Sequence, residues 1–246
     1  MNAKEKKKEQ KTRSEDSDAG TADLIRELGL AASGTDFESD LQYISIIGSI
    51  EGHIALPMEN KTTKYEHLIP QLIAVEENPK LRGLLVILNT MGGDVEAGLA
   101  LAEMIATLSK PTVSLVLGGG HSIGIPLATA TDYSFIAGTA TMTLHPIRTT
   151  GLVITAETTF DYMRKTQDRV IDFIAGHSRA TKKRVTELMN CSDNMSNDVG
   201  TILFGKEAVD AGIIDAVGGV SQALGELRRR VAKVDELEKG ISASID

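Results

Sequence analysis

The chain has 246 residues, of which 41% are hydrophobic and 24% charged, so it can bury one large core or two small ones. Its formal net charge of −8 disfavours a general nucleic-acid binder, which would carry a basic surface. The single cysteine, Cys191, cannot close an intramolecular disulfide and favours the reducing cytoplasm. Tryptophan is absent and aromatic residues make up 4%, which disfavours stacking platforms for single-stranded nucleic acid or carbohydrate.

The two ends of the chain differ in composition from the body between them. Residues 1–22 carry many charges of both signs and few apolar side chains, so we expect a disordered tail without the apolar stretch of a secretory signal. Residues 231–246 are charge-rich as well, and we expect them to fray after a final helix. One globular domain is predicted between these tails, over residues 23–230.

One uncharged stretch, Thr112–Thr131, is long enough to cross a bilayer. It contains several glycines and Pro126, which favour a strand, a tight turn and a buried helix over a membrane span. We therefore expect no direct insertion into a membrane.

Strand-like and helix-like patterns alternate along the body of the chain. Tyr43–Ile47 predicts a strand that ends at Gly48, and the apolar run 83–88 predicts a strand covered on both faces. Asp94 can cap the helix after this second strand. Repeated strand–helix–strand units predict a layered α/β fold with right-handed crossovers. The other predicted elements are the helix Glu66–Glu77, the strand Val113–Leu117, the short helix Ser122–Thr129, the strands Tyr133–Ile136 and Thr141–Leu144, the long helix Glu157–Gly176, and the helices Thr181–Met189 and Lys206–Ala211.

Two glycine-rich turns each join a predicted strand to a predicted helix. In the first, Gly92 and Gly93 allow a sharp turn whose N–H groups can hold an oxyanion or a phosphate, although an ordinary tight turn has the same pattern. In the second, Gly118–Gly124, Ser122 stands at the start of a helix, where the helix dipole favours a developing alkoxide. A simple helix cap is the alternative role for Ser122.

A histidine can supply the base that such a serine needs. His145 follows a short apolar strand and would have a pKa near neutrality, although a lone histidine is more often a packed core residue. His121 is the competing candidate, but adjacent side chains at a turn point apart, so it is poorly placed to reach Ser122. No spacing of histidines or carboxylates indicates a metal site, and we expect no cofactor.

The order and spacing of Gly93, Ser122 and His145 resemble those of the ClpP-type serine peptidases, whose fold is related to crotonase. The resemblance implies that Ser122 is the nucleophile and His145 the general base. It also implies that the N–H groups of Gly93 and Ile123 form the oxyanion hole. The resemblance extends from about Tyr43 to Gly219 and includes the segments 47–51, 71–79, 89–97 and 207–215.

The chain departs from the family pattern around these residues. Gly120 and His121 replace the usual two alanines before the serine, and Met91 replaces the proline before the glycine pair. Residues 58–65 form an insertion that the usual peptidase lacks.

The acid of the expected triad has two candidates in this chain. The family's aspartate falls where this chain has extra residues, so Asp198 is the nearest carboxylate and Asp193 the alternative. The blocks Gly118–Gly124 and Asn197–Thr201 look most similar to a translocation-enhancing subgroup of the family.

The resemblance implies a serine endopeptidase that cleaves peptides or unfolded proteins by a Ser-His-Asp mechanism, with signal peptides as possible substrates in support of protein translocation. A catalytically weak ClpP-like scaffold is the first alternative. A crotonase-like acyl-thioester enzyme, with the Gly93 region as its oxyanion hole, is the second.

The resemblance also implies homo-oligomeric rings, often of seven subunits, stacked through the long helix Glu157–Gly176. We expect this helix to protrude and to bury its apolar stripe against a partner subunit. The stripe comprises Phe160, Met163, Phe173 and Ile174. Whether an ATPase unfoldase is a further partner is left open.

Overall fold

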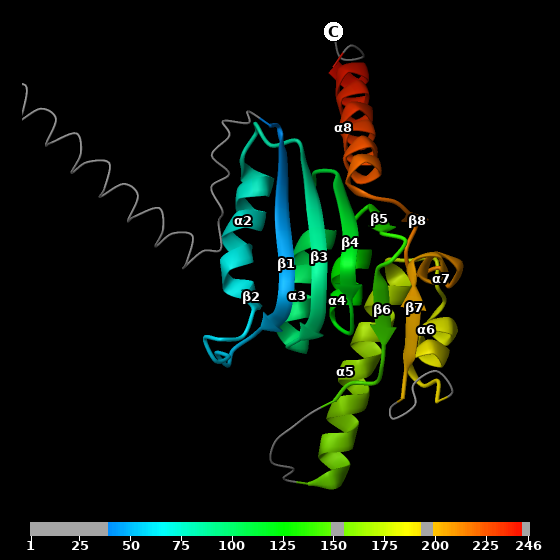
Figure 1. Ribbon diagram of the computed structural model, residues 1–246. Helices are drawn as coiled ribbons and strands as arrows, with labels where there is room; N and C mark the ends of the chain where they lie inside the picture. Colours follow the sequence, from blue (N-terminus) through cyan, green and yellow to red (C-terminus); the bar gives the residue numbers. More distant parts are fainter. Residues whose placement is uncertain (1–38, 149–154, 193–198, 243–246) are drawn as a thin grey trace, which may run out of the picture. The chain divides into compact units, whose positions relative to one another are not determined.

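The computed structural model describes residues 39–148, 155–192 and 199–242 (Figure 1). The expected N-terminal tail, residues 1–22, lies outside the described residues. The part from Asp40 onward is one compact unit, and the account below is of this unit.

A mixed sheet forms the centre of the fold and confirms the predicted α/β class. Six strands run in the order β2-β1-β3-β4-β5-β8, and each neighbouring pair among them is parallel. β6 pairs with β4 and, on its other side, with β7 in antiparallel fashion. The strands are β1 (Leu41–Glu51), β2 (Thr62–Lys64), β3 (Gly83–Gly93), β4 (Thr112–Gly120), β5 (Tyr133–Ile136), β6 (Thr141–Leu144), β7 (Thr201–Phe204) and β8 (Ala216–Val217).

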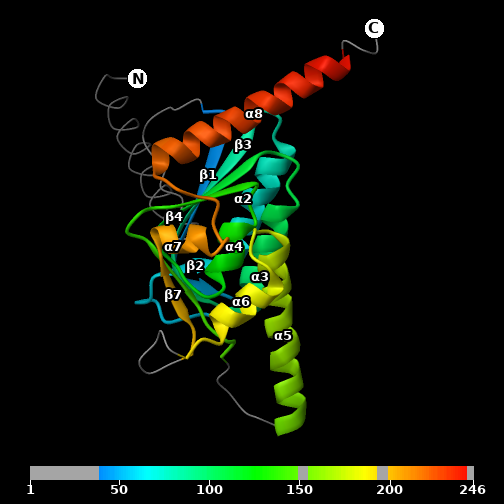
Figure 2. The ribbon, with the colours of Figure 1, turned by 90° about the vertical axis from the view of Figure 1, so that its right-hand side faces the viewer.

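Helices cover both faces of this sheet, which explains the nearly continuous apolar sequences of β3 and β4. Alternate strand residues face a large core that also contains side chains of α2, α3 and α4, and the remaining ones face a smaller cluster with α8. Figure 2 shows α8 at one end of the sheet and α5 at the other. The helices are α2 (Tyr65–Glu77), α3 (Val95–Ala106), α4 (Gly124–Thr129), α5 (Ala156–Gly176), α6 (Lys182–Met189), α7 (Gly205–Asp210) and α8 (Val220–Ser242).

Three strands run past the ends that the sequence predicted for them and include glycines. β1 passes Gly48 through a register shift and runs on to Glu51. Gly48 has a φ of 80°, and a Cβ there would strike the carbonyl oxygen of Lys61, so glycine permits a bend without ending the strand. β3 extends past its predicted end at Leu88 to Gly93, and β4 extends past Leu117 to Gly120.

The two long helices, α8 and α5, each differ from the expectation in one respect. α8 runs past the boundary predicted at residue 230 and remains helical to Ser242. α5 keeps its predicted bounds within one residue, but Phe173 and Ile174 are buried in the core of their own chain. Within the described unit they are therefore unavailable to a partner subunit, whereas Phe160 is 68% exposed.

The uncharged stretch Thr112–Thr131 forms β4, a turn and α4, as predicted. None of the helices in the described ranges combines the length and the apolar character needed to cross a bilayer.

Candidate active site

Ser122 lies on a strained turn between β4 and α4. Its φ is 55°, and among the described residues it is the only one other than glycine with a positive φ. The turn is fixed by hydrogen bonds from the N–H groups of Gly124 and Ile125 to the carbonyls of His121 and Ser122, at 2.9 and 3.0 Å. A bulky or β-branched residue at such a φ is an outlier, and strained positions of this kind concentrate at functional sites.

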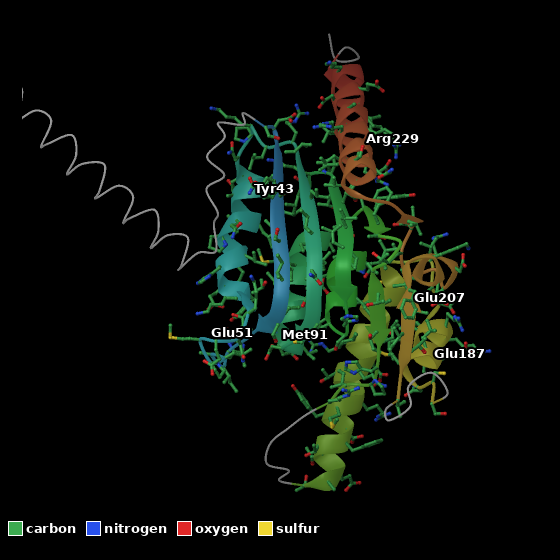
Figure 3. The ribbon with its side chains drawn as sticks, viewed as in Figure 1. Tyr43, Glu51, Met91, Glu187, Glu207 and Arg229 are labelled. Atoms are coloured by element: carbon green, nitrogen blue, oxygen red, sulfur yellow. The ribbon has the colours of Figure 1, made fainter. Side chains whose placement is uncertain are left out.

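The Gly92-Gly93 turn lies directly against Ser122. A Cβ added to Gly92, whose φ is 90°, would lie 2.7 Å from the Cβ of Ser122. The hydroxyl of Thr90 accepts a bond from the Gly92 N–H at 3.0 Å and donates to the carbonyl of Gly48 at 2.6 Å. Figure 3 labels Met91, which is 70% exposed, at this end of β3. The fold therefore joins the two glycine-rich turns that the sequence singled out.

The turn continues into a firmly capped helix. The Asp94 N–H donates to the carbonyl of Ile50 at 2.9 Å, and the Asp94 carboxylate accepts from the Ala97 N–H at 2.8 Å. This confirms the predicted N-cap of α3. Gly93 lies so close to the backbone of Ile50 that no side chain would fit there. The backbone of this turn is therefore held in one arrangement beside the serine.

Ile123 presents a backbone donor next to the serine. Its side chain is 2% exposed and belongs to the main core. Within the described part of the chain, no group accepts a hydrogen bond from its N–H. A fixed donor without a partner beside a candidate nucleophile is the feature an oxyanion hole needs.

His145 directly follows β6, and the fold brings β6 to the serine turn. The Ser122 N–H donates to the carbonyl of Thr143 at 2.8 Å. The half-buried His145 ring lies with Nδ1 2.7 Å from the carbonyl oxygen of Pro146. Because a carbonyl only accepts, Nδ1 carries the proton, and Nε2 of the neutral ring is left free to act as a base. Among the described residues, Ser122 and His145 share no hydrogen bond, as is common for catalytic pairs without bound substrate.

His121 lies beside this pair but points elsewhere. Its Nδ1 is 2.9 Å from the hydroxyl of Thr143, and its ring occupies the space that a side chain at Gly119 would need. Burial lowers the pKa of His121, and the nearby His145 lowers it further. His121 and His145 are therefore electrostatic neighbours, and desolvation disfavours the charged form of His121.

Both candidate acids, Asp198 and Asp193, lie outside the described residues. The flanking residues are described, and the N–H of Gly200 donates to the carbonyl of Cys191 at 2.8 Å. A Cβ at Gly200 would lie 3.0 Å from the Cβ of His145. Gly200 therefore packs against the candidate base, and Cys191 is hydrogen-bonded to Gly200.

Two positioning features were missed by sequence reasoning. Thr143 bonds to the backbone of Ser122 and to the side chain of His121, and Asn89 accepts from the N–H of Gly119 at 2.9 Å. Asn89 lies within a segment quoted for its family resemblance, but nothing in the sequence marked its side chain. Thr143 looked like an ordinary strand residue, so only the strand arrangement shows its place.

Two of the other histidines pack against aromatic rings. His53 contacts the ring of Tyr65 edge-on at 5.7 Å, and His177 stacks on Phe173 at 4.1 Å. In the described ranges, no three His, Cys, Asp or Glu side chains are grouped to hold a metal ion.

The chain matches known proteins over most of its length. The sequence model of the Clp protease family matches residues 39–221. The translocation-enhancing protein TepA of Halalkalibacterium halodurans strain C-125 is 54% identical over 215 residues, which cover 87% of this chain and 84% of that protein. Both matches include the serine turn, the glycine-pair turn and β6. The chain therefore belongs to the Clp protease family.

Proposed function

We propose that this chain is a serine endopeptidase in which Ser122 attacks the carbonyl carbon of a peptide bond. Nε2 of His145 takes the hydroxyl proton as the new C–O bond forms, and the N–H groups of Ile123 and Gly93 stabilise the resulting oxyanion. The C–N bond then breaks as His145 donates the proton to the leaving amine. Water hydrolyses the acyl-enzyme by the same steps and restores Ser122.

The strained backbone of Ser122 is the observation that carries this proposal. A serine that only capped a helix would adopt an extended φ, without the penalty of about 1–3 kcal/mol for a sparsely populated conformation. With φ at 55°, Ser122 is held at a sharp strand-to-helix turn beside two glycines. That arrangement is typical of a nucleophile.

The acid that orients His145 would come from the segment 193–198. Asp198 is two residues from Gly200, which packs against His145, and Asp193 is two residues from Cys191, which bonds to Gly200. Asp198 is our first choice and Asp193 the alternative. Either carboxylate would accept the hydrogen bond from Nδ1–H that the Pro146 carbonyl now accepts, and would stabilise the imidazolium.

The substrates we propose are peptides and unfolded protein segments. The matched relative is named for enhancing translocation, which supports signal peptides as one source of such substrates. We place the protein in the cytoplasm, in a homo-oligomeric ring. The exposed first half of α5 supports that assembly, since Phe160 is 68% and Tyr162 62% exposed. An ATPase partner is not required for peptide cleavage in this proposal.

A serine-directed fluorophosphonate probe tests the proposed nucleophile directly. Wild-type chain should gain the mass of one probe per chain, and Ser122→Ala should gain none. His145→Ala should react at least about a hundredfold more slowly, because the hydroxyl would lose its base. Equal labelling of wild type and Ser122→Ala would refute the assignment.

A catalytically weak scaffold is the competing function. It is favoured by two departures from the family pattern, namely His121 before the serine and the extra residues where the family's aspartate falls. The same probe decides between the two functions. A scaffold would form oligomers, measurable by sedimentation, while wild-type chain stayed unlabelled.

A further inference from the structure

Residues 121 and 122 make two separate hydrogen bonds to one residue of β6. The N–H of Ser122 donates to the Thr143 carbonyl at 2.8 Å, and the His121 ring bonds the Thr143 hydroxyl at 2.9 Å. The bond from Ser122 joins two backbone groups, and the bond from His121 joins two side chains. Together they fix both the position and the rotation of Thr143 relative to the serine turn.

Thr143 transmits this constraint to the candidate base. Side chains two residues apart in an extended segment point to the same face, and the alternating burial of residues 142–145 continues this pattern one residue past β6, which puts Thr143 and His145 on one face. In β6, Met142 and Leu144 are fully buried and Thr143 is half-buried, as is His145 directly after the strand. Holding the hydroxyl of Thr143 therefore orients the face from which His145 projects.

The chain leaves room for the imidazole of His121 and keeps it neutral. Gly119 has no side chain where the His121 ring lies, since a Cβ there would be 2.5 Å from Nε2. Burial and the neighbouring His145 both lower the pKa of His121. A neutral His121 does not repel the imidazolium that forms at His145 during the reaction.

We propose that His121 is a positioning residue that, through Thr143, sets the distance and orientation between Ser122 and His145. The proposal rests on the proposed function, because it concerns the alignment of that nucleophile with that base. His121 does not exchange a proton with substrate in this account. Its contribution is the hydrogen bond from the serine turn to β6.

A double-mutant cycle on the labelling rate tests this role. Removing either end of the bond between His121 and Thr143, by His121→Ala or Thr143→Val, should slow fluorophosphonate labelling of Ser122 about a hundredfold, the effect of a misplacement of roughly 1 Å. The double variant should be no slower than the slower single variant, because one interaction is lost in all three. His121→Asn and Thr143→Ser keep a polar group at each end and should recover most of the rate.

A histidine elsewhere provides a matched control. Nδ1 of His177 bonds the carbonyl of Phe173 at 2.8 Å, a length close to that of the His121 bond, at the end of α5. His177→Ala should therefore lower the midpoint of urea unfolding without slowing the labelling of Ser122. This comparison separates positioning from a general loss of stability.

Three outcomes would overturn the positioning role. The first is wild-type labelling rates in His121→Ala, and the second is single-variant effects that multiply in the double variant. The third is an equal loss of rate in His177→Ala. If wild-type chain does not react at all, the proposed peptidase function fails first, and the positioning role fails with it.

Discussion

Replacing Gly92 by alanine should damage both the fold and the reactivity of Ser122. At a φ of 90°, an added Cβ would lie 2.7 Å from the Cβ of Ser122 and 3.0 Å from the carbonyl oxygen of His121. An L-residue in a left-handed conformation costs roughly 1–2 kcal/mol. Overpacking typically adds about 1–3 kcal/mol. The free energy of unfolding should therefore fall by about 2–5 kcal/mol in Gly92→Ala.

The loss of reactivity follows from the same contact. Carbon atoms pack at about 3.5–4.0 Å, so Ser122 must move by roughly 1 Å to accommodate the new methyl group. A displacement of that size at a reacting group slows the reaction about a hundredfold. Fluorophosphonate labelling of Ser122 measures this rate, and urea unfolding of the same variant measures the stability.

Gly212→Ala is the matched control for this experiment. Gly212 has a φ of 80°, but the nearest atom to an added Cβ is 3.2 Å away, in the backbone of Ala180. The control should lose about 1–2 kcal/mol from the backbone penalty and label at the wild-type rate. Wild-type labelling in Gly92→Ala would refute the placement of the glycine turn against the nucleophile, and so would an equal loss in Gly212→Ala.

Two further predictions concern the titration of His121 and the half-buried carboxylate of Asp215. Burial and His145 lower the pKa of His121 in the folded chain. Below about pH 6.5, the folded chain therefore binds fewer protons than the unfolded chain. The free energy of unfolding should consequently fall on acidification, until the pH passes the lowered pKa. His121→Gln should flatten this decrease in urea titrations between about pH 8 and 5, and an unchanged slope would contradict the stated cause. The Asp215 carboxylate accepts from the N–H and the hydroxyl of Ser134 at 2.9 and 2.8 Å, and Ser134 is 3% exposed. Asp215→Ala should therefore lower the free energy of unfolding by roughly 2–4 kcal/mol, and Asp215→Asn by less; equal losses would show that these bonds contribute little.

Much of the element order could be predicted because hydrophobic periodicity is local. The strand 83–88, the cap at Asp94 and the long helix from about 157 to 176 are each recognised from a dozen neighbouring residues. The ends of the strands could not be predicted in this way. A glycine looks like a stop to local reasoning, but whether Gly48 ends or bends β1 depends on Lys61, which lies across the neighbouring turn.

The length of α8 was underestimated for a different reason. Charge dominates its composition after residue 227, which suggested a frayed tail. Yet Ala223, Leu227 and Val231 recur every fourth residue and pack on the second face of the sheet. In this helix the spacing of a few apolar residues outweighs the many charges, because the charged side chains only need to reach solvent.

In the candidate site, the sequence indicates which residues could react, but not how the fold places them. Ser122 and His145 are visible in the sequence because few residue types can act as nucleophile and base, and the family pattern fixes their order. Their alignment depends on Thr143, whose two bonds arise only when β6 lies beside the serine turn. A substitution at Thr143 should consequently affect the site as strongly as one at His121, although threonine carries no chemistry of its own. The proposed double-mutant cycle measures that equivalence.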